Sequence, residues 1–285
     1  MTKNVAGVVV LYNPEPVVVD NIQTYYASVE KLYVIDNTEH AAKEIIDEIS
    51  RRLPNAEYIP FNENLGIAKA LNEAATRAIQ EGFEWILTMD QDSSASAGMV
   101  ENLLKVTSKV KHTMVGIIAP QYIDDPIPSA SNGNAVEEAL TTITSGNLLN
   151  LVAFSDVGPF REELFIDFVD IDYCLRLNLK GYKVLISNQV KLEHQLGSAS
   201  CHSFFGRRLC TSNHNYIRRY YITRNRLAIL KEYKNVCPDY YQSEKNKNFI
   251  EITKLILFEK NKIKKIKSIL EGYIDFKRNK FGKYH

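Results

Sequence analysis

Residues Trp85-Ile86-Leu87-Thr88-Met89-Asp90-Gln91-Asp92 decide the fold, because they join a short apolar run to a pair of carboxylates. The run is typical of a buried strand. Two carboxylates separated by one residue point to the same side of an extended backbone, where a hard divalent cation could accept both oxygens. An aspartate that caps a helix near Ala97 is the alternative, and it accounts for one carboxylate but not for both. The pattern predicts a strand that ends in a metal-binding pair.

On both sides of this strand, apolar runs of strand length alternate with segments of helical spacing. In residues 66–82, apolar residues recur at intervals of three and four, and Gly82 ends the pattern. Such alternation indicates a doubly wound sheet with parallel strands. The expected strands are Gly7–Leu11, Leu32–Ile35, Ala56–Pro60, Trp85–Met89 and Val115–Ala119, and the expected helices are Val17–Val29, Ala41–Leu53, Gly66–Gly82 and Ala97–Val110.

Polar residues follow four of these strands at their C-terminal ends. They are Tyr12-Asn13, Asp36-Asn37, residues 61–64 and the Asp90-Gln91-Asp92 triplet. Open α/β sheets bind their ligands at this edge. Asp and Asn also start loops and cap helices, which explains any one of them. Four such ends on one edge favour a binding site.

The organisation changes after Pro120. The sequence predicts a loop over Tyr122–Glu138, a strand pair over Leu140–Phe154 around Ser145-Gly146-Asn147, and an acidic cluster that leads into a helix over Phe165–Leu179. A further strand is expected over Lys183–Ile186 and a further helix over Tyr216–Glu232.

The charge is unevenly distributed along the chain. The formal net charge of +1 excludes a globally basic nucleic-acid binder. Residues 243–285, however, hold eleven lysines and one arginine against four glutamates and one aspartate, a charge of +7, which leaves −6 for the first 242 residues. Apolar residues from Ile252 to Tyr273 recur at intervals of three, four and seven between these lysines. This pattern predicts a basic amphipathic helix or helix pair, which lies on an anionic membrane or packs on the catalytic domain or on another subunit.

The composition indicates a soluble globular protein, because 45% of the residues are hydrophobic and 24% are charged. Four scattered cysteines without a CxxC pair favour a reducing compartment over a disulfide scaffold. The run Val5–Tyr12 is interpreted as a first strand and not as a signal peptide, and no stretch reaches the ~18 apolar residues of a membrane span.

Several motifs occur in the order seen in family 2 glycosyltransferases, which the chain resembles over about Val5 to Leu230. They are residues 32–37, residues 62–68, the Asp90-Gln91-Asp92 triplet, Asp170-Ile171-Asp172-Tyr173-Cys174-Leu175-Arg176 and the later His194. Residues 165–170 and 220–225 favour the bacterial rhamnosyltransferase branch of the family.

The resemblance implies an α/β protein of the GT-A fold, a doubly wound mixed sheet with a C-terminal helical extension. It also implies a nucleotide-diphosphate sugar donor, Mg²⁺ or Mn²⁺, and inversion at the anomeric carbon. We expect a glycosyltransferase domain over residues 1–235, with a nucleotide-binding half (1–120) and an acceptor and catalytic half (121–235), followed by a basic helical tail (236–285).

The resemblance also implies roles for residues at the sheet edge. Asp92 would bind the metal directly, and His194 would close the metal and diphosphate site. Asp36 would contact the base or ribose. The other residues expected at the nucleotide are Tyr12, Asn64, Gly66, Lys69 and Asp90. Arg224 is a further candidate, since a planar guanidinium binds phosphate bidentately.

Asp170 is the predicted general base, which takes the proton of the acceptor hydroxyl during an inverting attack. Family members often have Glu-Asp here, whereas this chain has Val169-Asp170, so Asp170 alone carries the prediction and Asp172 is less favoured. The alternative is that these aspartates cap a helix and interact with its dipole.

The sequence thus predicts an inverting, metal-dependent transferase that moves a sugar, L-rhamnose from dTDP-L-rhamnose, to a cell-surface polysaccharide or its lipid-linked precursor in a bacterium. The alternatives are another nucleotide sugar, or a sugar-nucleotide-binding protein without turnover. Neither GxxxxGK[ST] nor a GxGxxG after a strand occurs, which argues against P-loop and dinucleotide chemistry. The expected location is the cytoplasm or the inner face of the cell membrane.

Overall fold

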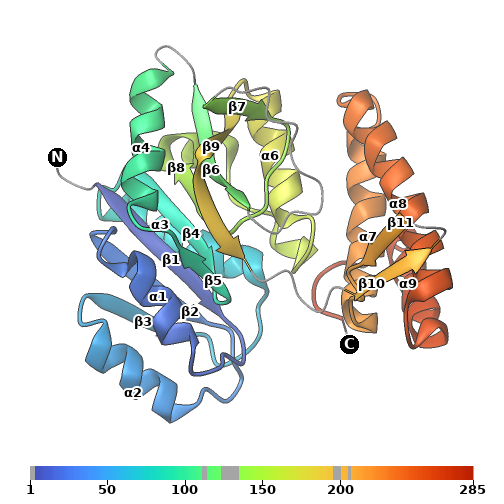
Figure 1. The fold of residues 1–285 in the computed structure, drawn as a ribbon, viewed down its shortest axis with the longest axis horizontal. Helices are drawn as coiled ribbons and strands as arrows, with labels where there is room; N and C mark the ends of the chain where they lie inside the picture. Colours follow the sequence, from blue (N-terminus) through green and yellow to red (C-terminus); the bar gives the residue numbers. More distant parts are fainter. Residues whose placement is uncertain (1–3, 111–113, 123–134, 195–199, 205–206, 285) are drawn as a thin grey trace. The chain divides into compact units, whose positions relative to one another are not determined.

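The first half of the chain forms the predicted alternation of strands and helices. The structure is a computed structural model that describes residues 4–110, 114–122, 135–194, 200–204 and 207–284. Four parallel strands lie in the order β3-β2-β1-β4 (Figure 1). The elements are β1 (Val5–Leu11), α1 (Val18–Tyr26), β2 (Lys31–Asp36), α2 (Lys43–Arg52), β3 (Ala56–Pro60), α3 (Ile67–Gln80) and β4 (Trp85–Asp90). Their C-terminal ends therefore meet at one edge of the sheet.

The second half of the sheet is mixed. The strand β8 is antiparallel to β4 and β6, β9 is parallel to β6, and β5 and β7 pair with β9 in the antiparallel sense. The described residues thus form the expected doubly wound mixed sheet of nine strands. The elements are β5 (Ser93–Ala95), α4 (Met99–Lys109), β6 (Val115–Tyr122), β7 (Val136–Ala139), β8 (Asn147–Asn150), α5 (Leu151–Val157), the 3₁₀ turn η1 (Glu162–Leu164), α6 (Val169–Leu179) and β9 (Lys183–His194).

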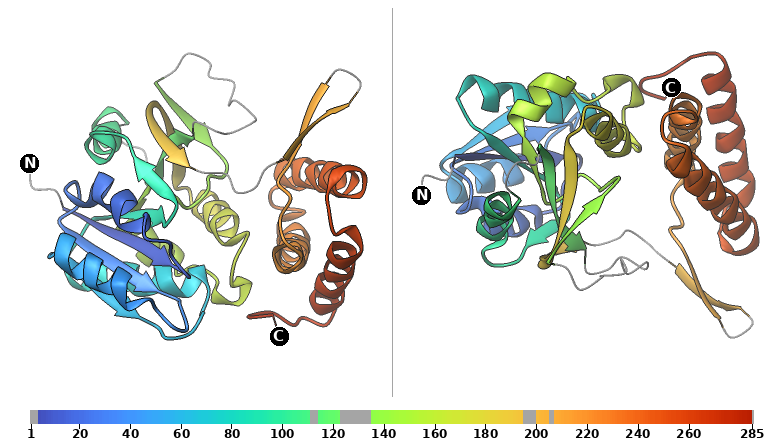
Figure 2. Two further views of the ribbon diagram at one scale, coloured as in Figure 1. Left: turned by 60° about the horizontal axis from the view of Figure 1, so that its bottom comes forward. Right: turned by 90° about the horizontal axis from the view of Figure 1, so that it is seen from above.

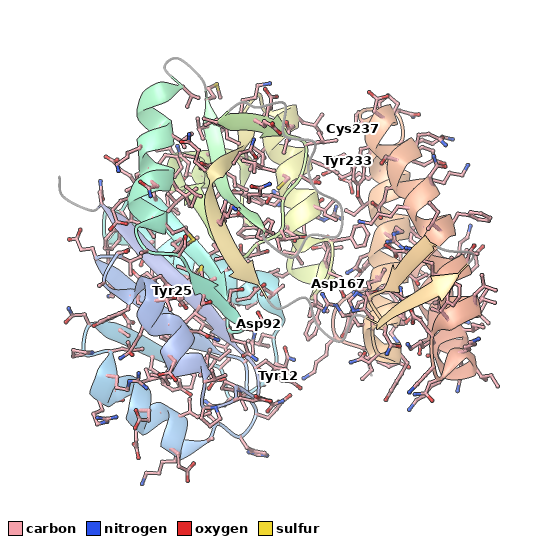
Figure 3. The ribbon with its side chains drawn as sticks, in the orientation of Figure 1. Tyr12, Tyr25, Asp92, Asp167, Tyr233 and Cys237 are labelled. Atoms are coloured by element: carbon pink, nitrogen blue, oxygen red, sulfur yellow. The ribbon has the colours of Figure 1, made fainter. Side chains whose placement is uncertain are left out.

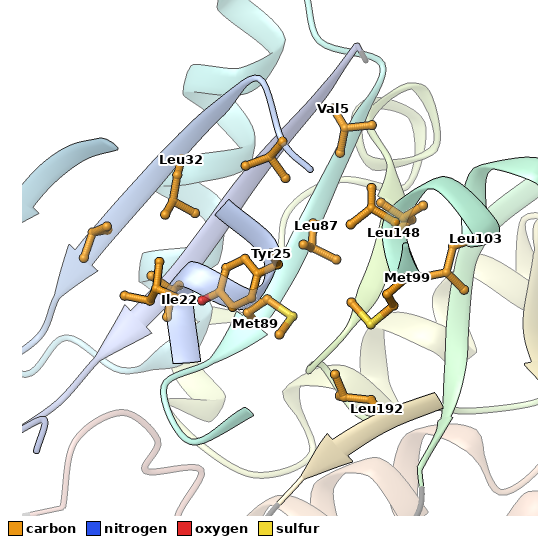
Figure 4. Close-up of a cluster of buried hydrophobic side chains, with 14 of the residues drawn as sticks. Val5, Ile22, Tyr25, Leu32, Leu87, Met89, Met99, Leu103, Leu148 and Leu192 are labelled. Atoms are coloured by element: carbon orange, nitrogen blue, oxygen red, sulfur yellow. The ribbon is translucent and has the colours of Figure 1, made fainter. Parts of the chain in front are cut away.

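Helices cover both faces of this sheet (Figure 2). On one face, α1, α2 and α4 bury their apolar stripes against the strands. Figure 4 shows part of this core, where Ile22 and Tyr25 of α1 and Met99 of α4 lie over Leu87 and Leu148. Burying such side chains contributes about 1.5–3 kcal/mol each, so this layer holds the strand ends in place.

The predicted strand pair over Leu140–Phe154 is wrong. Only β8 forms there, and α5 follows it directly. The Asn150 side chain caps this helix, accepting hydrogen bonds from the Val152 and Ala153 amides at 2.9 and 3.2 Å. A short apolar run allows a strand or a helix, and the cap decides for the helix. Most of the loop expected over Tyr122–Glu138 lies outside the described residues.

The chain divides into two compact units. Unit 1 comprises residues 1–162 and 169–195, and unit 2 comprises residues 163–168 and 196–285. Unit 2 contains a hairpin and three helices, which are β10 (Ser200–Phe204), β11 (Arg207–Thr211), α7 (Tyr216–Tyr233), α8 (Pro238–Phe258) and α9 (Lys262–Lys277).

The division into compact units falls before α7, and the glycosyltransferase domain expected over residues 1–235 stays a prediction. The helices α7 and α9 lie so close that a Cβ on Gly272 would be 2.6 Å from the Tyr220 carbonyl oxygen. The expected C-terminal helical extension is present as α8 and α9. No helix among the described residues is long and apolar enough to cross a membrane.

Candidate active site

The polar residues after β1, β2 and β4 come together at one edge of unit 1. In the strand register, Leu11 pairs with Asp36 and Val10 pairs with Asp90. The Tyr12 amide donates to Gln91 Oε1 at 2.8 Å, and Gln91 Nε2 donates to the Tyr12 carbonyl at 3.2 Å. Figure 3 labels Tyr12 and Asp92 at the end of the sheet where β1 and β4 finish. The polar residues that the sequence places after these strands therefore lie close together at one edge of the sheet.

Asp36 is buried at the end of β2. Its Oδ1 accepts a hydrogen bond from the Thr38 amide at 2.8 Å, and its Oδ2 accepts one from the Tyr58 hydroxyl at 2.7 Å. Burial, reinforced by the Asp36 charge, raises the pKa of Tyr58 above its usual range. Each carboxylate oxygen has a second lone pair, but Asp36 exposes only 3% of its surface. Its contact with a base or ribose stays a prediction.

Asn37 is a residue that sequence reasoning missed. It is buried, its Nδ2 donates to the Gly66 carbonyl at 3.3 Å, and its Oδ1 accepts from the Leu65 amide at 3.2 Å. Asn64 Oδ1 accepts from the Gly66 amide at 3.0 Å, and Gly66 has φ 86° and ψ 165°, a conformation open to glycine. Asn37 and Asn64 thus fix the turn that starts α3. The signal was its position directly after Asp36 at a strand end.

Lys69 lies in the first turn of α3 and pairs with a partner that the sequence did not indicate. Its Nζ is 3.5 Å from Glu162 Oε1, and both side chains are more than 40% exposed. A pair this exposed contributes little to stability. Lys69 is therefore available to other anions, and its contact with a nucleotide stays a prediction.

Asp90 and Asp92 differ in their surroundings. The Asp90 amide donates to Ser145 Oγ at 3.1 Å, and this hydroxyl donates to Ser93 Oγ at 2.8 Å. Asp90 is half-buried, whereas Asp92 is exposed. The aspartate pair is followed at once by β5 and not by a helix, so the helix-capping alternative does not apply to Asp92.

The strand β5 places the backbone of His194 beside the aspartate pair. Ser93, the neighbour of Asp92, is in register with His194 at the end of β9. The His194 side chain and residues 195–199 lie outside the described residues. The sheet thus brings together three positions that the sequence predicts for a metal site, although they are about 100 residues apart.

The aspartate pair suits a hard divalent cation that keeps much of its shell for water and phosphate. Carboxylate oxygens are the donors that Mg²⁺ and Mn²⁺ prefer. Among the described residues, no three His, Cys, Asp or Glu side chains form a complete cage. Mg²⁺ commonly binds through one or two carboxylates together with water and substrate phosphates.

Asp170 is the second residue of α6 and is half-buried. It lines a small cavity together with Thr88, Thr144 and Asn147. Thr88 lies two residues before Asp90 on β4, so the two side chains project from the same face of the sheet. The cavity therefore places the predicted general base under the strand that carries the aspartate pair.

Tyr122 is influenced by the charges of both Asp90 and Asp170, and no sequence motif indicated it. Its hydroxyl donates to the Ser145 carbonyl at 2.9 Å. Burial raises the pKa of Tyr122 above its usual range, and the charges of Asp90 and Asp170 raise this pKa further. Both carboxylates thus face the same part of unit 1. This acidic region would hold an anionic diphosphate only with a cation between them.

Asp172 has a structural role. It is fully buried, and its two oxygens accept hydrogen bonds from Arg161 at 3.2 Å and Arg176 at 2.9 Å. Arg176 also donates to the Pro159 carbonyl at 2.8 Å. Asp172 thereby holds the turn before α6, as expected for the less favoured aspartate. Cys174 is buried beside it, and burial raises the pKa of its thiol to about 12, in keeping with a core residue.

Arg224 does not offer its guanidinium to a diphosphate in this structure. The side chain is fully buried in unit 2, where it donates to the Gly282 carbonyl at 2.8 Å and to the Leu164 carbonyl at 3.1 Å. It also lies over the rings of Tyr220 and Tyr221 at 5.3 and 5.1 Å. Its donors are engaged with carbonyls, so we leave Arg224 out of the proposed site.

The chain belongs to glycosyl transferase family 2, whose family model matches residues 8–161. Together with the mixed sheet, this makes it a glycosyltransferase of the GT-A fold. The match includes the β1, β2, α3 and β4 site residues and ends before Asp170 and His194.

The chain is similar to the dTDP-rhamnosyl transferase RfbF of Shigella flexneri, with 29% identity over 301 aligned residues and 96% of each chain covered. Solved structures share the fold at lower identity. TarS 1-349 of S. aureus has a TM-score of 0.61 at 14% identity, with 95% of this chain and 80% of that chain covered. The mannosyltransferase PcManGT of Pyrobaculum calidifontis, solved with GDP-Man and Mn²⁺, has 0.60 at 12%, with 96% and 75% covered. GalNAc-T7, solved with UDP, GalNAc and Mn²⁺, has 0.58 at 12%, and the match covers 83% of this chain and about half (49%) of that one.

Proposed function

We propose that this glycosyltransferase moves L-rhamnose from dTDP-L-rhamnose, with inversion, to a cell-surface polysaccharide or its lipid-linked precursor. The observation that carries the proposal is the placement of Asp170 in a cavity under β4, the strand that ends in Asp90 and Asp92. The donor rests on the similarity to RfbF over nearly the whole chain. A membrane-associated acceptor would also suit an enzyme at the inner face of the cell membrane.

The chain's own residues divide the work. Asp92, with His194 and the nearby Asp90, would hold Mg²⁺ or Mn²⁺, which when bound would neutralise the charge that grows on the leaving diphosphate. Tyr12, Asp36, Asn64, Gly66 and Lys69 line or support the edge at which the nucleotide would lie. Asp170 would orient the acceptor hydroxyl and accept its proton from the face opposite the leaving group.

The donor is best identified by thermal unfolding with a panel of nucleotide sugars, each with and without Mg²⁺ or Mn²⁺. A ligand that binds only the folded state raises the apparent stability by mass action. We expect dTDP-rhamnose with metal to give the largest rise in melting temperature. A larger rise with a UDP- or GDP-sugar would assign a different donor.

Two aspartate variants test the site. Asp170→Asn should lower the rate of transfer by about 100-fold to 10,000-fold, because a positioned general base contributes that much. It should leave the donor-induced thermal shift unchanged. Asp92→Asn should abolish the part of this shift that depends on metal. Asp47→Asn is the matched control, since Asp47 is an exposed residue of α2 outside the proposed site. Wild-type transfer by Asp170→Asn would reject Asp170 as the base.

A further inference from the structure

The helix α9 carries polar and small residues on its inner face and apolar residues on its outer face. Lys265, Ser268 and Gly272 are buried within unit 2. On the opposite side, Ile263 is 87% exposed and Leu270 is 56% exposed. The other exposed apolar residues of α9 are Ile266, Tyr273 and Ile274. Their spacing of three and four residues forms one stripe, which is the reverse of the pattern of a helix packed in water.

Specific contacts fix α9 in this orientation. Lys265 Nζ lies 2.7 Å from Glu259 Oε2 and 2.7 Å from Asn213 Oδ1. Glu259 Oε1 accepts a second hydrogen bond from Arg219 of α7 at 2.6 Å. Gly272 leaves no room for a side chain against the Tyr220 carbonyl. Turning the apolar stripe inward would leave these buried charges unpaired, which costs several kcal/mol for each ion.

The helix α8 likewise turns charged residues inward and apolar residues outward. Its buried Glu244 accepts a hydrogen bond from Arg226 Nε at 2.8 Å, and Glu251 accepts one from Arg226 Nη2 at 2.9 Å. On its outer face, Phe249 is 73% exposed and Leu257 is 54% exposed. Ile250, Ile252 and Ile256 are also exposed there. Unit 2 therefore buries several ion pairs beside its apolar core and has two apolar outer stripes.

The inward ion pairs also separate the charges. Glu244, Glu251 and Glu259 are engaged with Arg219, Arg226 or Lys265 inside the unit. The exposed lysines remain outside, beside the apolar stripes, and they are Lys245, Lys247, Lys260, Lys264, Lys267 and Lys277. The outer surface is thus apolar and basic at once.

We propose that the apolar stripes of α8 and α9, with their flanking lysines, bind the surface of an anionic lipid bilayer. Below they are called the outer stripes. An apolar helix face flanked by lysines gains from both the acyl boundary and the anionic headgroups, and it lies on the bilayer without crossing it. A second copy of the chain fits less well, because a two-fold contact would bury the same lysine-rich surface of both copies against itself. The proposal does not depend on the donor, the metal or Asp170.

Co-sedimentation with vesicles tests this proposal on the full chain without donor or metal. We expect the protein to sediment with vesicles of phosphatidylcholine and phosphatidylglycerol, about tenfold less with phosphatidylcholine alone, and less as the salt concentration rises. The double variant Ile263→Ser with Leu270→Ser should lower binding to anionic vesicles by at least about tenfold. The matched control is Val152→Ser with Leu179→Ser, two exposed apolar residues of unit 1 that should leave binding unchanged.

Substitution of charge separates the electrostatic part of binding. Lys267→Gln with Lys277→Gln should weaken binding to anionic vesicles several-fold, whereas Lys43→Gln with Lys105→Gln in unit 1 should not. Circular dichroism checks that each variant is folded. Failure of the wild-type protein to sediment with anionic vesicles at low salt would overturn the proposal. A second outcome would also overturn it. If the wild-type protein is a dimer that does not bind vesicles, and Ile263→Ser with Leu270→Ser makes it monomeric, then a second copy of the chain covers the outer stripes.

Discussion

Val169 stands directly before the predicted base Asp170, at the position where the resemblance to family 2 glycosyltransferases leads us to expect a glutamate. It is the first residue of α6, and it is 2% exposed. A carboxylate at this position would be buried. The missing glutamate therefore reflects a core position in this chain, and the catalytic prediction falls on Asp170 alone.

The substitution Val169→Glu tests this view. We expect the free energy of unfolding to fall by about 2 kcal/mol, because a buried polar group without a built partner is costly. We expect no faster transfer. Urea unfolding and a transfer assay measure the two effects. Val152→Glu is the control, since Val152 is 68% exposed on α5. A Val169→Glu protein of wild-type stability with faster transfer would mean that the site accommodates a second carboxylate.

Residue-scale prediction from the sequence worked where the signal was a strand end. Asp36, Asp90 and Tyr12 lie together, as the parallel arrangement requires. The roles of Asn37 and Tyr122 were not predicted because they depend on partners 28 and 23 residues away in the chain, and for Asn37 only the place at a strand end could be foreseen. The burial of Arg224 could not be foreseen for a related reason, since it follows from the packing of α7 and not from its own neighbours.

At the scale of elements, the segment 163–168 stands out as a strained connection. Phe165, Asp167 and Phe168 have φ of 66°, 60° and 67°, and such residues cost about 1–3 kcal/mol each. The helix α7 holds this conformation, because Asn225 Nδ2 donates to the Leu164 and Ile166 carbonyls, both at 2.8 Å. Arg224 adds its bonds to the same segment. These contacts lie within unit 2 and fix the conformation of the segment.

Arg224→Lys separates this structural role from a contact with the donor. A lysine cannot bond several carbonyls in the plane of a guanidinium. We therefore expect the free energy of unfolding to fall by about 2–3 kcal/mol, as measured by urea unfolding. Arg51→Lys, at an exposed arginine of α2, should have no effect. Unchanged stability together with a raised KM for the donor would instead return Arg224 to the nucleotide site.

The elements with strong periodicity were predictable, and those decided by contacts were not. The strands β1 to β4 and the helices between them follow their sequence patterns closely. The three-residue strand β5 exists because it pairs with β9, and α5 exists because Asn150 caps it. The tail was correctly expected to be helical and amphipathic. The direction of its apolar face could not be foreseen, because it depends on ion pairs between α7, α8 and α9.

At the scale of the whole chain, the two units use charge in opposite ways. Unit 1 carries its acidic pair at the edge of the sheet, where Asp90 is half-buried and Asp92 is exposed. Unit 2 buries Glu244 and Glu259 with arginines and a lysine. The net charge of +1 therefore hides a difference in where the two units carry their acidic residues. Because unit 2 holds charged groups close together in its interior, its stability depends on the pH at which a buried group takes up a proton.

His214 gives this dependence a measurable form. It lies between β11 and α7, and burial together with Arg218, Arg219 and Lys265 lowers its pKa to about 3. The unfolded chain takes up a proton near pH 6.5, whereas the folded chain does not until a much lower pH. Stability is therefore complete above about pH 6.5 and is lost as the pH falls towards 3. At pH 5 this loss should reach about 1–2 kcal/mol.

His214→Gln removes the titrating group and should flatten the stability profile between pH 7 and pH 5. Urea unfolding at each pH measures the difference from the wild-type protein, which should widen as the pH falls because only the wild-type unfolded state gains the proton. His40→Gln, at an exposed position after β2, should follow the wild-type profile. If His214→Gln and the wild-type protein lose stability in parallel over this range, His214 takes up its proton in the folded state. The cationic surroundings in unit 2 would then be open enough for water to screen them.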